Sequence, residues 1–124
     1  MRNLLIIALL ISTVYSANAQ ENNNIALLNL SDFKTQIENK DVQLIDVRTP
    51  EEFKEGHVDG ALNIDYYSQG FETQFSKLDK EKPVYLYCRS GFRSNESAKK
   101  LAKMGFKTLY DLEGGFLNYN KNKE

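Results

Sequence analysis

The stretch that most constrains the fold of this chain is a short strand, a loop and a helix around its single cysteine. Val84–Tyr87 is an apolar run with aromatic and β-branched side chains, which is typical of a buried strand. The run ends at Cys88 and is followed by a tight loop that contains Gly91. A helical pattern begins near Ser94, with one face formed by Ala98, Leu101, Ala102 and Gly105. The sequence therefore places Cys88 between the end of a strand and the start of a helix.

This position favours an anion, because the first amides of a helix are unpaired and carry the positive end of the helix dipole. In the loop CRSGFRS the successive N–H groups can converge above the sulfur, and Gly91 permits a backbone angle that other residues resist. Arg89 and Arg93 add positive charge. These influences favour the thiolate at Cys88, which we predict is the nucleophile. The residues expected to bind the substrate are Arg89, Ser90, Gly91, Phe92, Arg93 and Ser94.

Cysteine usage supports this interpretation, because exported chains usually use cysteines in pairs and this one has a single cysteine. An inert thiol in the core is the alternative. Export itself is expected from residues 1–19: Arg2 is followed by the apolar run Leu4–Ile11 and by the small-residue site Ala17-Asn18-Ala19, a pattern typical of a signal peptide. The apolar run is too short for a membrane anchor, and we expect a periplasmic protein.

The rest of the chain alternates strands and helices. After a flexible lead at residues 20–24, we predict one domain over residues 25–120 and a frayed tail at 121–124. The expected strands are Ile25–Leu30, Val42–Val47, Leu62–Ile64 and Phe106–Tyr110. The first two expected helices are Asp32–Glu38, with Ser31 as its N-cap, and a short helix that begins with Thr49-Pro50-Glu51-Glu52 and ends at Gly56. Two more helices are expected at Phe71–Leu78 and around Phe116 and Tyr119, the last one after the turn Gly114-Gly115.

This alternation predicts an α/β domain with a mainly parallel sheet covered by helices on both faces. Ligands of such sheets bind beyond the carboxyl ends of the strands, where Cys88 lies.

Three other residues invite functional roles, and we interpret each as structural support. Asp46 and Arg48 project on the same side of a strand end and are suited to an ion pair. His57, the only histidine, is a possible general base, but it lies in a compact turn where histidine commonly binds backbone groups. One histidine and one cysteine make a poor metal site, so no metal is expected.

Three segments in this order and spacing resemble the rhodanese (thiosulfate sulfurtransferase) family: LIDVRTPEEFKEGHVDGALNI, YCRSGFRS and MGFKTLYDLEGGF. The likeness is to its small single-domain members, with the periplasmic phage-shock type as the nearest analogy. The resemblance implies a rhodanese-like domain with a five-stranded, mainly parallel sheet and the cysteine loop at its edge. It also implies sulfur transfer: Cys88 attacks a sulfane donor such as thiosulfate, sulfite leaves, and a persulfide passes its outer sulfur to cyanide or a thiol.

Two alternatives remain. A persulfide carrier or sulfur-delivery module would use the same cysteine without turnover. A cysteine phosphatase or arsenate reductase is disfavoured by loop length, since Cys88 and Arg93 are separated by four residues where phosphatases have five. The expected partners are a small sulfane-sulfur donor, a thiol or cyanide acceptor and a possible exported protein acceptor. No cofactor, nucleic acid or membrane anchor after cleavage is expected, and the net charge of −1 gives no sign of nucleic acid binding.

Overall fold

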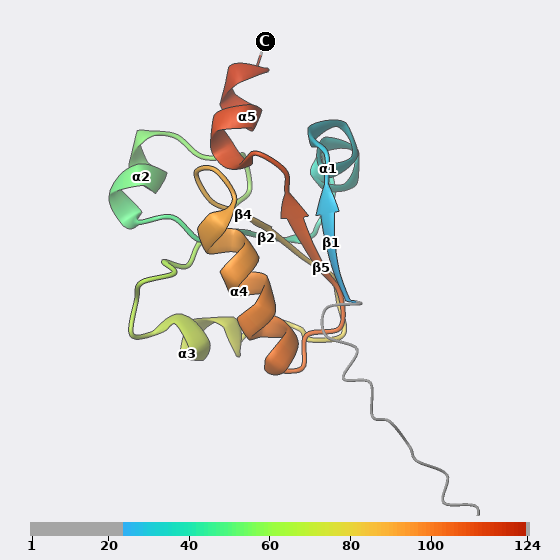
Figure 1. Ribbon diagram of the computed structural model, residues 1–124, viewed down its shortest axis with the longest axis vertical. Coiled ribbons are helices and arrows are strands. Elements are labelled where there is room, and N and C mark those ends of the chain that lie inside the picture. The colour runs from blue at the N-terminus through green and yellow to red at the C-terminus, as the bar shows by residue number, and fades with distance from the viewer. Residues whose placement is uncertain (1–23, 124) are drawn as a thin grey trace, which may run out of the picture.

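The computed structural model describes residues 24–123, which form one α/β domain (Figure 1). The expected signal peptide, residues 1–19, lies outside the described residues, as do residues 20–23 of the expected lead. In chain order the elements are β1 (Ile25–Leu28), α1 (Leu30–Ile37), β2 (Gln43–Asp46), α2 (Pro50–Glu55), β3 (Leu62–Asn63), α3 (Phe71–Phe75), β4 (Val84–Tyr87), α4 (Phe92–Lys103), β5 (Leu109–Leu112) and α5 (Gly115–Lys121).

The strands form one sheet in the order β1-β5-β4-β2-β3. Every strand pairing within residues 24–123 is parallel, which confirms the fold class expected from the alternating pattern. Strand β4 is central and buried at all four positions, as its apolar sequence predicts. Asp46, the last residue of β2, pairs with Tyr87, the last residue of β4, so the residues that follow these two strands lie at the same edge of the sheet.

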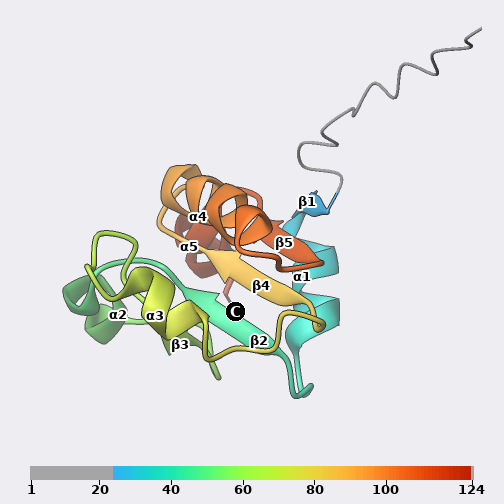
Figure 2. The same ribbon diagram turned by 90° about the horizontal axis from the view of Figure 1, so that it is seen from below.

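The two faces of the sheet carry separate apolar cores, and Figure 2 shows α4 and α1 on opposite sides. One core joins α3 and α4 to the sheet, with Phe75, Leu86 and Leu101 among its buried residues. The other joins α1 to Tyr85, Tyr87 and Leu112, with Phe116 and Tyr119 of α5 packed against it. Helices α1, α3 and α4 therefore each bury apolar side chains against the sheet. No helix in the described part of the chain has the length and hydropathy needed to cross a membrane.

Several element boundaries differ from those expected. The N-cap of α1 is Asn29, whose side chain accepts a hydrogen bond from the Asp32 amide at 2.8 Å, so the prediction of Ser31 was wrong. Helix α3 ends at Phe75 and not at Leu78. Strand β5 begins at Leu109 rather than Phe106 and continues to Leu112.

The ends of the domain also differ. Asn24, expected to be part of a flexible lead, is tied to the fold: its side chain donates to the Phe106 carbonyl at 2.8 Å. Helix α5 extends to Lys121, one residue beyond the predicted end of the domain.

Candidate active site

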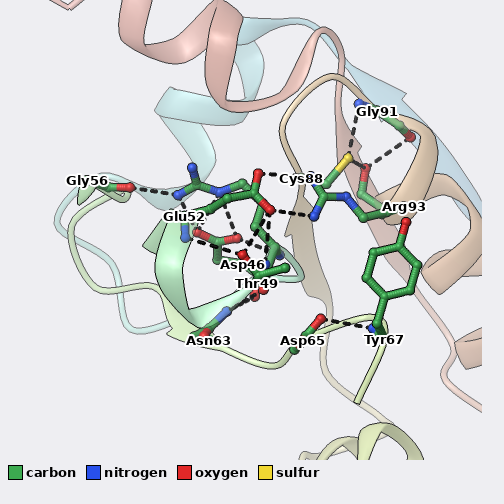
Figure 3. A network of polar contacts seen from close by, with 12 residues as sticks. Asp46, Thr49, Glu52, Gly56, Asn63, Asp65, Tyr67, Cys88, Gly91 and Arg93 are labelled. Atoms are coloured by element: carbon green, nitrogen blue, oxygen red, sulfur yellow. Dashed lines mark hydrogen bonds and ion pairs between the residues drawn. The ribbon is translucent and has the colours of Figure 1, made fainter. Parts of the chain in front are cut away.

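Cys88 lies directly after β4, and the loop from Cys88 to Gly91 leads into α4. The helix begins at Phe92, two residues earlier than the sequence indicated, and Gly91 is its N-cap with φ 123°. The Gly91 N–H donates a hydrogen bond to Cys88 Sγ at 3.0 Å, and the Ser94 hydroxyl donates to the same sulfur at 3.4 Å (Figure 3). The loop thus turns an amide and a hydroxyl toward the sulfur, an arrangement that stabilises negative charge there.

Cys88 is 1% exposed and forms part of the apolar core under α4. Two polar donors nevertheless lie on its sulfur, so the thiol is not surrounded by hydrocarbon alone. Buried structural cysteines need no such donors. The arrangement therefore favours a functional thiol over an inert one.

The cysteine loop is held from the far side by α5, at whose N-terminus it lies (Figure 1). The Phe116 amide donates to the Cys88 carbonyl at 2.7 Å, and the Leu117 amide donates to the Arg89 carbonyl at 3.1 Å. Gly115 has φ 58°, and a Cβ at this position would come within 2.6 Å of both carbonyl oxygens. The sequence predicted only a tight turn at Gly114-Gly115; the pair also brings the amides of α5 against the loop.

Arg93, expected to bind the substrate, is engaged by Glu52 of α2 in a bidentate ion pair. Its Nη1 lies 2.6 Å from Glu52 Oε1 and its Nη2 lies 3.0 Å from Oε2 (Figure 3). The hydrogen bond from Arg93 is the main reason why the pKa of Glu52 is lowered to about 2. Sequence reasoning did not find Glu52, because it is 41 positions away in the chain.

Glu52 is itself fixed by the start of α2. As predicted, Thr49 caps this helix and Pro50 occupies its first turn. The cap is reciprocal: the Thr49 hydroxyl accepts from the Glu52 amide, and the Glu52 carboxylate accepts from the Thr49 amide at 3.2 Å. A helix cap thus positions the carboxylate that holds Arg93.

Asp46 and Arg48 form the buried ion pair that the sequence indicated. Arg48 Nη2 lies 2.7 Å from Asp46 Oδ2 and also donates to the Gly56 carbonyl at 2.7 Å. Burial acts to lower the pKa of Arg48, but the hydrogen bonds and charge of Asp46 raise it above its usual value. The guanidinium also lies 4.1 Å from the centroid of the Phe116 ring, so the pair supports α5.

His57 makes its contacts at the end of α2. Its Nδ1 lies 2.9 Å from the Phe53 carbonyl oxygen, and its ring stacks on Phe53 at 3.7 Å between centroids. Histidine binds a backbone group here, as the compact turn indicated.

The outer surface of the loop is formed by exposed side chains. Arg89 and Ser90 are exposed, and Phe92 is 69% exposed. Tyr67 is also exposed, and its ring centroid lies 6.0 Å from the Arg93 guanidinium carbon. The predicted loop residues therefore divide into an inner pair that contacts the sulfur, half-buried Gly91 and buried Ser94, and an outer set that faces solvent, Arg89, Ser90 and Phe92. Arg93 is half-buried and is paired with Glu52. No group of three His, Cys, Asp or Glu side chains suited to a metal ion occurs in the described residues.

A parallel five-stranded sheet with a cysteine loop at its carboxyl edge defines the class of this protein, and the family comparison agrees: residues 29–122 match the rhodanese-like domain, and the chain belongs to that family. It is 32% identical over 89 residues to the thiosulfate sulfurtransferase GlpE of Shewanella oneidensis, a match that covers 72% of this chain and 86% of the relative.

Two further relatives are longer than the matched region. Protein YqhL of Bacillus subtilis is 47% identical over 74 residues, covering 60% of this chain and 57% of the relative. The tRNA uridine(34) hydroxylase of Pelagibacter ubique is 38% identical over 87 residues, 69% of this chain but 29% of that enzyme. The chain thus spans less than two thirds of the length of these two relatives.

Solved structures show the same fold. A protein from Saccharomyces cerevisiae superimposes with a TM-score of 0.70 and 28% identity, over 79% of this chain and 92% of that one. The human single-domain sulfurtransferase TSTD1 superimposes with a TM-score of 0.67 and 20% identity, over 79% and 97% of the two chains.

Proposed function

We propose that this protein is a rhodanese-type sulfurtransferase that moves sulfane sulfur through a persulfide on Cys88. The observation that carries the proposal is the pair of donors on the sulfur, the Gly91 amide at 3.0 Å and the Ser94 hydroxyl at 3.4 Å. The similarity to the thiosulfate sulfurtransferase GlpE supports the reaction class.

The reaction proceeds in two steps. The Cys88 thiolate attacks the outer sulfur of thiosulfate, a sulfur–sulfur bond forms, and the bond to the departing sulfite breaks, which leaves a persulfide anion on the enzyme. Cyanide or a thiol then attacks the outer sulfur and regenerates the thiolate. Because Cys88 is 1% exposed, a small donor suits the site better than a large one.

Arg89 and Arg93 have different roles in this proposal. Arg89 is exposed and free to meet the oxyanion end of a donor, whereas the charge of Arg93 is shared with Glu52. Replacing Arg93 by Ala removes the cation that pairs with Glu52 and leaves that carboxylate as an uncompensated anion. We expect kcat/KM for thiosulfate to fall by roughly ten- to a hundredfold, as for the loss of a charge-assisted hydrogen bond.

The matched variant is the double replacement of Arg93 and Glu52 by Ala, which removes both charges. It is expected to recover part of the loss with thiosulfate, and an uncharged persulfide donor is expected to show little change in either variant. Equal losses for charged and uncharged donors would contradict the electrostatic role of Arg93.

The function is tested by incubating the protein with thiosulfate, measuring its intact mass for the gain of one sulfur, and then adding cyanide and measuring thiocyanate. We expect loading and turnover by the native protein and neither by Cys88→Ser, whose fold is verified by circular dichroism. Thiocyanate formation by Cys88→Ser at the native rate would exclude Cys88 as the nucleophile. Loading without turnover would identify a sulfur carrier, and hydrolysis of a phosphate ester would favour a phosphatase.

A further inference from the structure

Glu52 is a carboxylate bound to the cysteine loop that has no part in the two steps of the proposed reaction. It belongs to α2, yet it accepts two hydrogen bonds from Arg93 of α4, at 2.6 and 3.0 Å. The Arg93 and Glu52 side chains are 14% and 26% exposed, so water and salt screen their charges less than those of an open surface pair. One of the two arginines of the loop is therefore bound to a fixed anion.

Glu52 is held in this position by the start of its own helix. Its Oε1 accepts from the Thr49 amide and from the Thr49 hydroxyl, each at 3.2 Å, and its own amide donates to that hydroxyl at 3.3 Å. A side chain that is already ordered loses little further entropy when it pairs with Arg93. An incoming anionic donor must therefore compete with a carboxylate that is in place beforehand.

The ion pair sets the charge that a donor meets. Arg89 is exposed, while the charge of Arg93 is offset by Glu52, so these side chains together present a single net positive charge. The hydrogen bond to Glu52 is the main cause that raises the pKa of Arg93, and the charge of Cys88 adds to it. Thiosulfate is doubly charged, and the thiolate that attacks it is also an anion. Repulsion in this site is therefore smaller for a donor with a single negative charge.

Exposed aromatic side chains lie at the same place. Phe92 follows Gly91, whose amide donates to the sulfur, and is 69% exposed. Tyr67 is 67% exposed, and its ring centroid lies 6.0 Å from the Arg93 guanidinium carbon (Figure 3). These two are the most exposed large hydrophobic side chains among residues 24–123. An apolar group on the donor would remove part of their surface from water.

We propose that Glu52 is a specificity-determining residue: by neutralising Arg93 it favours sulfane donors with a single negative charge over thiosulfate. Phe92 and Tyr67 accept the apolar group that such a donor carries. A thiosulfonate, in which an apolar group, a sulfonyl and the transferred sulfur are joined in that order, has this chemistry. The Cys88 thiolate forms a bond to the outer sulfur, the bond from that sulfur to the sulfonyl breaks, and the electron pair leaves with the sulfinate. The inference rests on the proposed function, because it needs Cys88 as the nucleophile.

The test compares thiosulfate with methanethiosulfonate, since both carry the transferred sulfur on a sulfonyl group but one is doubly and the other singly charged. Each kcat/KM is measured as thiocyanate formed at saturating cyanide. In Glu52→Gln the side-chain oxygen can still accept from Thr49, but the charge is gone. A charge acts on a dianion about twice as strongly as on a monoanion, so kcat/KM is expected to rise about tenfold for thiosulfate and about threefold for methanethiosulfonate.

The ratio of the two kcat/KM values is the decisive quantity, because any change in the reactivity of Cys88 cancels from it. In Glu52→Gln the ratio is expected to shift about threefold toward thiosulfate. Arg93→Gln leaves the carboxylate without its cation, and the ratio is expected to shift by about threefold in the opposite direction. Glu51→Gln is the matched control, because Glu51 is exposed and lies in the same first turn of α2, and its ratio is expected to equal that of the native protein.

A second comparison tests the apolar group, with benzenethiosulfonate against methanethiosulfonate at equal charge. In Phe92→Ala the preference for benzenethiosulfonate is expected to shrink by about threefold, because less apolar surface is available to the ring. Leu27→Ala is the control, since Leu27 is 61% exposed on the edge strand β1, and its preference is expected to match that of the native protein.

A thiosulfate ratio that folded Glu52→Gln does not raise overturns the proposal. Should that variant fail to fold, as judged by circular dichroism, an unchanged ratio in Arg93→Gln overturns it. A preference for benzenethiosulfonate that is undiminished in Phe92→Ala overturns it as well. The intact mass separates these failures from that of the proposed function: a protein that gains no sulfur from any of these donors refutes both, whereas loading with unmoved ratios refutes this inference alone.

Discussion

Replacing Asp111 by Asn is expected to stabilise the protein in a way that depends on pH. The side chain is 2% exposed and its pKa rises from 3.8 to about 6 on folding, so folding requires either protonation or the burial of a charge. A carboxyl whose pKa is higher in the folded state contributes its full stability below the unfolded value. That contribution is lost as the pH rises to about 6 and stays lost above it.

The magnitude follows from the shift. A change of about two pH units, at about 1.4 kcal/mol per unit, corresponds to about 3 kcal/mol. Asparagine is neutral at all these pH values. The difference in free energy of unfolding, Asp111→Asn minus native, is therefore expected to grow by about 3 kcal/mol between about pH 2 and about pH 8, and most of this increase falls between pH 4 and pH 7. The value at low pH measures the separate cost of exchanging a neutral acid for an amide.

The assay is urea unfolding across this pH range, with linear extrapolation to zero denaturant. A Cys88→Ser background removes the thiolate from the titration. Asp41→Asn, at an exposed position, subtracts the general effect of deleting one carboxylate. A difference that stays constant from low to neutral pH would refute the reasoning, because it would mean that Asp111 is ionised in the folded protein throughout.

Three further replacements test the scaffold of the site. Gly115→Ala places a Cβ 2.6 Å from the Cys88 carbonyl oxygen, and it is expected to lower the stability by at least about 2 kcal/mol and to remove most of the activity. Gly60→Ala is the control, because Gly60 also has a positive φ but has open space around its Cβ position, so this variant measures the backbone strain alone. Thermal melts and rate assays are compared for the two variants. Arg48→Ala leaves Asp46 as an unpaired buried charge and should destabilise by about 3–5 kcal/mol in urea unfolding, and a loss below about 1 kcal/mol would argue against a structural role. Glu52→Gln removes a carboxylate whose pKa is lowered to about 2. The native protein is therefore expected to be more stable than the variant above about pH 4.5, and this advantage is expected to fade as the pH falls toward 2. Acid titration of both proteins by circular dichroism measures the difference, and parallel curves would contradict the expectation.

Local chemistry explains why much of the fold was predictable. The cap of α2 lies within four residues, Thr49 to Glu52, and all its partners are visible in sequence. Phe33 and Ile37 are one turn apart, and both are buried as their spacing predicts. The cap of α1 was misassigned because Asn29 and Ser31 are both good cap residues, and the end of β1 decides between them.

The site was predictable only in its local part. Cys88, Gly91 and Ser94 lie within seven positions, and strand-loop-helix geometry brings them together. Other features of the site involve residues far apart in the chain: the ion pair of Arg93 with Glu52, the position of Asp111, and the hydrogen bonds from α5 to the cysteine loop. Their meeting depends on strand order and helix packing, which residue patterns constrain loosely.

The hydrogen bonds from α5 to the Cys88 and Arg89 carbonyls also set an order for maturation. Synthesis runs from the amino end to the carboxyl end, so Cys88 leaves the ribosome before the helix that secures its loop. Until Gly115–Lys121 has docked, the Cys88 and Arg89 carbonyls lack the two amides that hold the loop. A chain cut short before Phe116 would keep every residue of the cysteine loop and lose the two amides that hold the Cys88 and Arg89 carbonyls, so its loop is expected to be less ordered.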